Sequence, residues 1–175
     1  GAWWASGKLQ EAMADFDKAI ELGYTASHAF LSRGLFHAAQ GRTQEAIQDY
    51  TVALEKAPQD TAPRINRAAA YFAEGKWADA VNDYSAAIVQ QPQNALLYQQ
   101  RALAHKAMNR SDLAVADFTE AIKLVGNRKV ESIPALMGRG YLYFQLSQFQ
   151  LAVDDFGQVI EINPNAAVAF NNRGY

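Results

Sequence analysis

The sequence of 175 residues contains no cysteine. This absence excludes a disulfide framework, a thiolate zinc site and a cysteine nucleophile. It leaves the localisation unknown, because cysteine-free proteins occur in every compartment. No apolar stretch approaches the roughly 18 residues that a membrane-spanning helix requires. We therefore expect no membrane insertion.

The chain also lacks a large excess of positive or negative charge. It has 16 Lys and Arg residues and 18 Asp and Glu residues, for a net charge of −2. A chain without a basic excess has little electrostatic attraction for nucleic acid or for an anionic membrane surface. We expect no nucleic-acid partner.

Motifs that carry chemistry are missing as well. The three histidines form neither an HExxH motif nor an i, i+4 pair with a carboxylate, so a metal site is not expected. Gly138 and Gly140 give a GxG pattern without a third glycine or a preceding strand, which excludes a phosphate-binding loop. The sequence thus predicts no enzyme activity, no catalytic residue, no metal and no cofactor.

The sequence does contain an internal repeat. Alanines recur at intervals of 34 residues, with a last step of 38, and an aromatic residue lies four positions after each of them. A second alanine, replaced by Val159 in the last repeat, lies seven positions after the first, so all three share one face of an α-helix. The first alanines are Ala12, Ala46, Ala80, Ala114 and Ala152, and the aromatic residues are Phe16, Tyr50, Tyr84, Phe118 and Phe156.

Each such helix is preceded by another helix and a short turn. We expect the turn residue to tolerate a positive φ, as Gly does and Asn does less readily. The turn residues are Gly7, Gly41, Gly75, Asn109 and Ser147. Prolines at 58, 92 and 164 end the second helices. The predicted helices cover residues 28–40, 43–57, 62–73, 77–90, 96–108, 111–124, 134–146 and 149–162.

Four extra residues lie within Val125–Ser132. We expect them to lengthen the second helix of the fourth repeat or the loop after it, with the closing proline displaced to Pro134.

This pattern resembles the tetratricopeptide repeat family, whose repeats of 34 residues carry the sequence pattern W-x2-L-G-x2-Y…A-x3-F…P. Phe30, Gly34 and His37 occupy the W, G and Y positions of one repeat. The family's Leu position carries an arginine in every repeat, which indicates a subtype with a recurring Arg-Gly or Arg-Ala. These arginines are Arg33, Arg67, Arg101, Arg139 and Arg173.

The resemblance implies an all-α fold, a right-handed superhelical α-solenoid of antiparallel helix pairs. A single array then covers residues 1–175, with full repeats at 27–60, 61–94, 95–132 and 133–166 and partial repeats at 1–26 and 167–175. The chain begins within a first helix at Gly1–Trp4 and stops within another at Tyr175. Neither end supplies the polar cap that a repeat stack needs, so we expect an excerpt of a longer array.

The recurring arginines are matched by recurring aspartates, namely Asp15, Asp49, Asp83, Asp117 and Asp155. One interpretation is a basic stripe that binds phosphate. The other is a structural Arg–Asp bridge, which the planar guanidinium favours because it can bind a carboxylate with two parallel hydrogen bonds. Equal numbers and equal periodicity favour the structural interpretation. We expect Arg67 to pair with Asp49 across the repeat junction or, failing that, with Asp83 in its own repeat.

The resemblance also implies that the first helices line a concave groove in which a peptide or a partner helix lies. Alternatively, this stripe packs against a neighbouring helix. The expected groove residues are Leu31, Leu35, Ile65, Asn66, Ala69, Phe72, Gln99, Leu103, Lys106, Met137, Tyr141, Phe144 and Asn171. The Lys and Arg of the clamp with which some family members grip a chaperone's C-terminal carboxylate are missing from the matching positions, so that function is not expected.

Two functions remain open. The first is a non-catalytic scaffold that binds an apolar or amphipathic segment of a protein or peptide partner. The alternative is a self-assembling architectural or regulatory arm of a larger protein or enzyme, associating through its uncapped ends. His37 and His105, in the family's Tyr position, are expected to be packing residues in either case.

Overall fold

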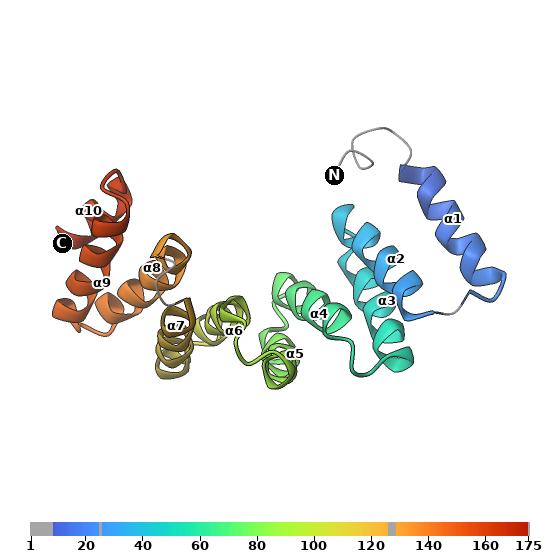
Figure 1. Ribbon diagram of the computed structural model, residues 1–175, viewed down its shortest axis with the longest axis horizontal. Coiled ribbons are helices and arrows are strands. Elements are labelled where there is room, and N and C mark those ends of the chain that lie inside the picture. Colours follow the sequence, from blue (N-terminus) through green and yellow to red (C-terminus); the bar gives the residue numbers. More distant parts are fainter. Residues whose placement is uncertain (1–8, 25, 126–128, 175) are drawn as a thin grey trace. The chain divides into compact units, whose positions relative to one another are not determined.

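The computed structural model describes residues 9–24, 26–125 and 129–174 (Figure 1). These residues form helices joined by short turns, with no strand among them. The helices are α1 Leu9–Glu21, α2 Ser27–Ala39, α3 Thr43–Lys56, α4 Thr61–Ala73, α5 Trp77–Gln90, α6 Ala95–Ala107, α7 Ser111–Val125, α8 Lys129–Gln145, α9 Phe149–Ile162 and α10 Ala167–Arg173. Seven of the eight predicted helices therefore begin and end within one residue of their predicted bounds. The expected helix at Gly1–Trp4 lies outside the described residues.

The chain forms two compact units, residues 1–83 and 84–175, and α5 spans the division. In the first unit α2 packs against α3, and α3 packs against α4. In the second unit α6 to α10 pack against one another in chain order. In the pairs α2–α3, α4–α5, α6–α7 and α8–α9 the two helices are antiparallel, because a turn of only three residues joins them.

The second helix of each pair supplies the core, as the spacing of its small and aromatic residues predicts. Ala46, Tyr50 and Ala53 of α3 are buried on one face, at i, i+4 and i+7. The same positions are buried in α5, α7 and α9. Alanine permits a close approach of the neighbouring helices, and the aromatic ring fills the space beside it. The predicted core face of these helices is confirmed.

The turns between paired helices contain a residue with positive φ, as expected. Gly41 and Gly75 have φ values of 73° and 72°, and Asn109 and Ser147 have values of 57° and 58°. A glycine carries no steric penalty in this region of φ, whereas a residue with a Cβ atom is disfavoured there. The corresponding turn at Gly7 lies outside the described residues.

The placement of the four extra residues was predicted wrongly. The helix α8 has 17 residues, against 13 in α2, α4 and α6, and it begins at Lys129. The extra residues thus extend the N-terminal end of a first helix. Pro134 is the sixth residue of α8 and therefore does not close the preceding helix. It removes one backbone hydrogen bond, the one that an N–H at this position would donate to the carbonyl oxygen of Val130.

No helix in the described ranges is long and apolar enough to span a membrane.

Candidate functional site

The thirteen residues expected to line a groove lie on the first helices α2, α4, α6, α8 and on α10. None of them is fully buried. Eight are half-buried, and five are exposed, namely Leu35, Ala69, Tyr141, Phe144 and Asn171. These helices therefore keep an accessible face besides the one that packs against the second helices.

In the first unit this face is mostly aliphatic. Leu31 packs on the buried cluster around Tyr50, and Leu35 is 40% exposed one turn further along α2. Ile65 and Phe72 of α4 are half-buried. The Nδ2 atom of Asn66 donates to the carbonyl oxygen of Ala62 at 2.8 Å, which ties this amide to its own helix.

In the second unit the accessible face converges on Tyr141 of α8. The Nζ atom of Lys106 lies 5.8 Å from the centre of the Tyr141 ring, a cation–π arrangement between α6 and α8. The ring of Phe156, from α9, meets the Tyr141 ring edge-to-face at 5.6 Å. The Nδ2 atom of Asn172, from α10, donates to the Tyr141 hydroxyl at 2.6 Å. Four helices thus each contribute one side chain to a cluster around the Tyr141 ring.

Leu103 of α6 and Met137 of α8 are half-buried and pack against two clusters of core residues. The sequence did not single out Asn172 or Phe156 for the site. A signal for Asn172 existed, since it occupies the same repeat position as Asn66. The spacing of Phe156 predicts only a core residue, which it also is.

Four of the five recurring arginines, Arg33, Arg67, Arg101 and Arg139, bind the aspartate of their own helix pair with two hydrogen bonds each. In the first unit the Arg33 Nε and Nη2 atoms donate to the Asp49 carboxylate at 2.9 and 2.7 Å. In the second unit the same arrangement joins Arg101 to Asp117 and Arg139 to Asp155. These guanidinium groups are already paired with buried carboxylates. This pairing supports the structural interpretation over a phosphate-binding stripe.

The expected pairing of Arg67 with Asp49 across the junction is wrong. Arg67 pairs with Asp83, the alternative partner, through bonds of 2.7 and 2.9 Å. The reason is the geometry of an antiparallel helix pair, in which residues equally distant from the turn face each other. Gly75, the turn residue, lies eight positions from both Arg67 and Asp83.

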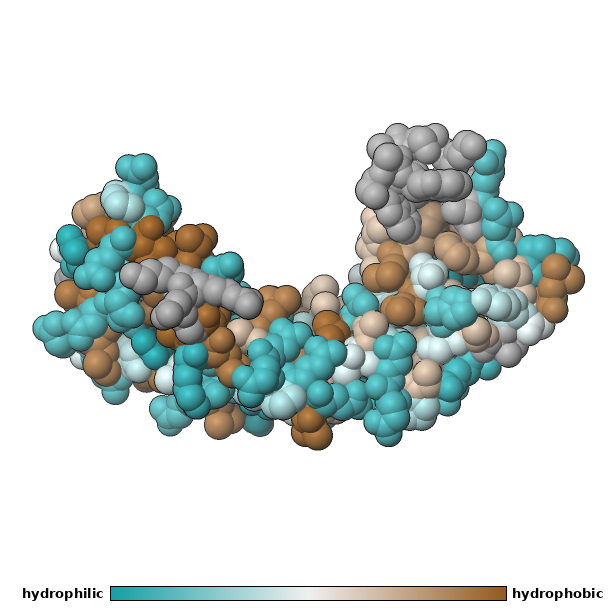
Figure 2. Space-filling view, viewed as in Figure 1, coloured by the Kyte–Doolittle hydropathy of each residue, from teal (hydrophilic) through white to brown (hydrophobic). Residues whose placement is uncertain are grey.

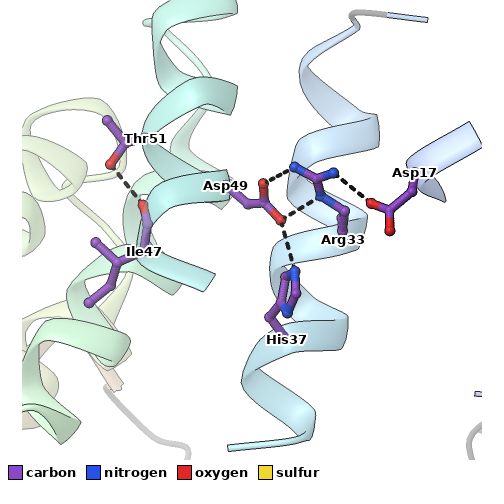
Figure 3. A network of polar contacts seen from close by, with 6 residues as sticks. All are labelled: Asp17, Arg33, His37, Ile47, Asp49 and Thr51. Carbon is purple, nitrogen blue, oxygen red and sulfur yellow. Dashed lines mark hydrogen bonds and ion pairs between the residues drawn. The ribbon is translucent and has the colours of Figure 1, made fainter. Parts of the chain in front are cut away.

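The junction to the preceding repeat is made by the third guanidinium nitrogen. The Nη1 atom of Arg67 donates to the Thr51 hydroxyl at 3.0 Å, and that of Arg101 donates to Ser85. Arg33 has an aspartate, Asp17, in this place, at 2.7 Å (Figure 3). Each arginine therefore links its own helix pair to the helix before it. Bonds to the carboxylates raise the pKa of these arginines, so the links stay charged.

His37 and His105 are buried beside these bridges, as expected for packing residues. The Nε2 atom of His37 lies 3.7 Å from Asp49, and that of His105 lies 3.8 Å from Asp117. The Nδ1 atom of each has no hydrogen-bond partner among the described residues. Burial lowers the pKa of both histidines, because a charged imidazole loses hydration there.

Within the described ranges no group of three or more His, Asp or Glu side chains is placed to hold a metal ion.

Family comparisons agree with the helix pattern. Sequence profiles of the tetratricopeptide repeat match residues 2–61, 68–109, 95–124 and 133–166. All four describe repeats, and none describes an enzyme family. No curated protein matches the chain. The recurring arginine as the mark of a subtype stays a prediction.

Several solved structures share the fold. MamA from Desulfovibrio magneticus RS-1 is 16% identical, with a TM-score of 0.83 over 92% of this chain and 89% of that one. YrrB, described as a TPR protein with an unusual peptide-binding site, is 17% identical, with a TM-score of 0.83 over 96% of this chain and 84% of that one. The first TPR of Spaghetti, bound to an HSP90 peptide, is 25% identical, with a TM-score of 0.64 over 69% and 93%. The predicted α-solenoid fold is confirmed by these likenesses.

Proposed function

Because the chain belongs to the tetratricopeptide repeat family, we propose that it is a non-catalytic protein-interaction scaffold whose first helices bind an apolar or amphipathic peptide segment. The observation that carries the proposal is the exposure of large apolar side chains on these helices. Leu35, Tyr141 and Phe144 are 40%, 37% and 41% exposed, although the core beside them is closed. Accessible apolar groups in a folded chain are typical of an interaction surface.

Two of the similar structures support a peptide as the partner. YrrB carries a peptide-binding site by its description, and the first TPR of Spaghetti was solved with the HSP90 peptide SRMEEVD. The charge of the accessible face differs from that of an acidic-peptide receptor, since Lys106 is the one charged residue among the thirteen groove positions. An apolar or amphipathic segment fits this composition better than a strongly acidic one.

The proposal is tested by selecting peptides from a random library displayed on phage against the immobilised chain. The affinity of synthetic copies for the chain is then measured by calorimetry. Leu103→Ala and Tyr141→Ala should each weaken binding by at least about 1 kcal/mol, because binding energy concentrates in a few large apolar contacts. Glu55→Ala, on the exposed side of the second helix α3, is the control and should leave the affinity unchanged. Loss of affinity in the control alone would contradict the proposed face.

Self-association is a second candidate, supported by the surface of α10. Val168 and Phe170 of this helix are 58% and 45% exposed. A second copy of the chain could cover them, as the architectural alternative requires. Sedimentation of the chain across a range of concentrations tests this. A mass that grows with concentration and is restored to the monomer by Val168→Ser with Phe170→Ser would favour self-association. A mass that stays that of the monomer at all concentrations would contradict self-association and leave the peptide scaffold as the proposed function.

A further inference from the structure

A small pocket opens between α8, α9 and α10 in the second unit. It is lined by Tyr141, Phe144, Phe156 and Asn172 and has a volume of about 50 Å³. Figure 2 shows hydrophobic surface gathered over these helices. Three of the four lining side chains are aromatic, so the pocket offers an apolar interior with a single amide at its edge.

The walls of the pocket are held in place by specific contacts. The Tyr141 ring is fixed by the bond from Asn172 and by the edge-to-face contact with Phe156. The ring of Phe149 braces Phe144 edge-to-face at 5.7 Å. Aromatic side chains held by such contacts lose little conformational entropy when a ligand binds, so the pocket is preorganised.

The floor of the pocket depends on Gly140. A Cβ atom at this position would lie only 2.8 Å from the Phe156 ring, so the missing side chain allows the ring to reach α8. Phe156 is itself 1% exposed, yet it lines the pocket. One core residue therefore also forms part of an accessible site.

The size of the pocket selects a ligand group of about four non-hydrogen atoms. At least about 10–15 Å³ is needed to hold one water molecule, so this half-open pocket of about 50 Å³ accommodates a few non-hydrogen atoms, as at the end of an aliphatic side chain. The side chains of Leu, Ile and Met each have four non-hydrogen atoms. An alanine would leave the pocket unfilled, and a tryptophan would exceed it.

Charge selects against a basic ligand. Lys106 already lies over the Tyr141 ring, where a cationic side chain of a partner would gain its cation–π contact. A second positive charge there would be repelled, whereas a carboxylate near the anchor would be attracted. The last turn of α8 and the first turn of α9 contain no charged residue that changes this preference.

From the size, the apolar lining and the position of Lys106, we propose that this pocket binds one Leu, Ile or Met side chain of a peptide that carries an acidic residue beside it. The inference rests on the proposed function, because it names the anchor of the peptide that the first helices bind. Two of the predicted groove residues of the second unit, Tyr141 and Phe144, thus line this pocket.

The first experiment uses single capped amino acids as probes, so that it does not depend on a selected peptide. N-acetyl-leucinamide, N-acetyl-methioninamide, N-acetyl-alaninamide and N-acetyl-lysinamide are titrated into the isotope-labelled chain and followed by NMR. The leucine and methionine probes should shift the Asn172 side-chain amide signals saturably, and the alanine and lysine probes should not. Equal shifts with all four probes, or none with any, would overturn the proposal.

The second experiment fills the pocket. Asn172→Leu places an apolar side chain at its edge, and Gln158→Leu makes the same amide-to-leucine change at an exposed position of the second helix α9 as a matched control. Peptides selected against the chain should contain an aliphatic residue next to an acidic one. They should lose about tenfold in affinity with Asn172→Leu, the loss expected for a single anchor, and keep their affinity with Gln158→Leu. Circular dichroism confirms that both variants fold.

The outcomes separate the pocket from the wider proposal. Peptides that bind the chain without an aliphatic consensus, and equally well in both variants, would overturn the pocket and leave the scaffold function intact. A saturable leucine probe together with no selected peptide would support the pocket and contradict the peptide scaffold. A Lys106→Glu variant adds a check, because it should remove the preference for an acidic neighbour.

Discussion

Arg67 binds Asp83 with two parallel hydrogen bonds, and the two residues lie at equal distances along the chain from the turn residue Gly75. The Arg67 guanidinium also donates to Thr51 of the preceding helix pair. A single side chain therefore joins three helices, α3, α4 and α5, within the first unit. The bridge is largely shielded from solvent, since the Arg67 and Asp83 side chains are 18% and 8% exposed.

Removal of this link should destabilise the fold. We expect Arg67→Ala to lower the free energy of unfolding by about 1–3 kcal/mol, because the buried Asp83 carboxylate loses both hydrogen bonds and keeps only the 3.8 Å ion pair with Arg64 Nη1. Urea denaturation followed by circular dichroism measures the change. Lys123→Ala is the control, since Lys123 pairs with Glu120 on the exposed surface, where an ion pair contributes about 0–1 kcal/mol. Equal midpoints for Arg67→Ala and the parent chain would contradict the structural role.

The buried histidines should make stability depend on pH. Desolvation lowers the pKa of His105, while Asp117 raises it and Arg101 and Arg110 lower it. The unfolded chain has the ordinary histidine pKa of about 6.5, so it takes up a proton at a pH where the folded chain does not. The free energy of unfolding should therefore fall as the pH decreases through this value and below it.

The variant His105→Gln tests this dependence. It keeps a polar side chain and removes the titratable group, so the fall in stability between about pH 7 and pH 5 should become smaller. His37→Gln should act in the same direction, because burial also lowers the pKa of His37. Urea midpoints at several pH values give the comparison. A fall of the same size in the parent chain and the double variant would show that other groups govern it.

Two helical glycines should respond oppositely to the same substitution. A Cβ atom at Gly140 would lie 2.8 Å from the buried Phe156 ring, whereas one at Gly157 would meet nothing within 4 Å. We expect Gly140→Ala to destabilise the fold by about 1–3 kcal/mol through overpacking. Gly157→Ala should stabilise it by about 0.5–1 kcal/mol, because alanine loses less entropy in a helix. Thermal unfolding measures both, and shifts of the same sign would contradict the packing argument.

Much of the fold could be predicted because the same sequence pattern recurs in each repeat. The spacing of Ala46, Tyr50 and Ala53 defines a helix face by itself, and Gly41 and Gly75 mark the turns. The start of α8 could not be predicted in this way. The repeat spacing does not distinguish four extra residues in a helix from four extra residues in a loop. Pro134 can likewise lie in the early part of a helix or follow the end of one.

The bridges and the pocket show where periodicity is insufficient. Counting along the chain gave Arg67 a partner 18 residues before it, while the antiparallel pair places the partner 16 residues after it. That choice depends on which helices face each other. The pocket depends on a contact across the helix pair, where the absence of a side chain at Gly140 admits the Phe156 ring. Neither relation is contained in the order of residue types along one helix.

The last prediction concerns the salt dependence of peptide binding. Exposed charge pairs are screened by salt, with a Debye length near 10 Å at about 0.1 M, whereas apolar contacts are not. Affinity for a selected peptide should change little between low and physiological salt, because Lys106 is the one charge among the groove positions. Phe72→Ala and Tyr141→Ala should each cost at least about 1 kcal/mol at either salt concentration. Calorimetric titrations at two ionic strengths decide the matter. An affinity that collapses with added salt, or that is insensitive to both substitutions, would place the partner on the charged second helices.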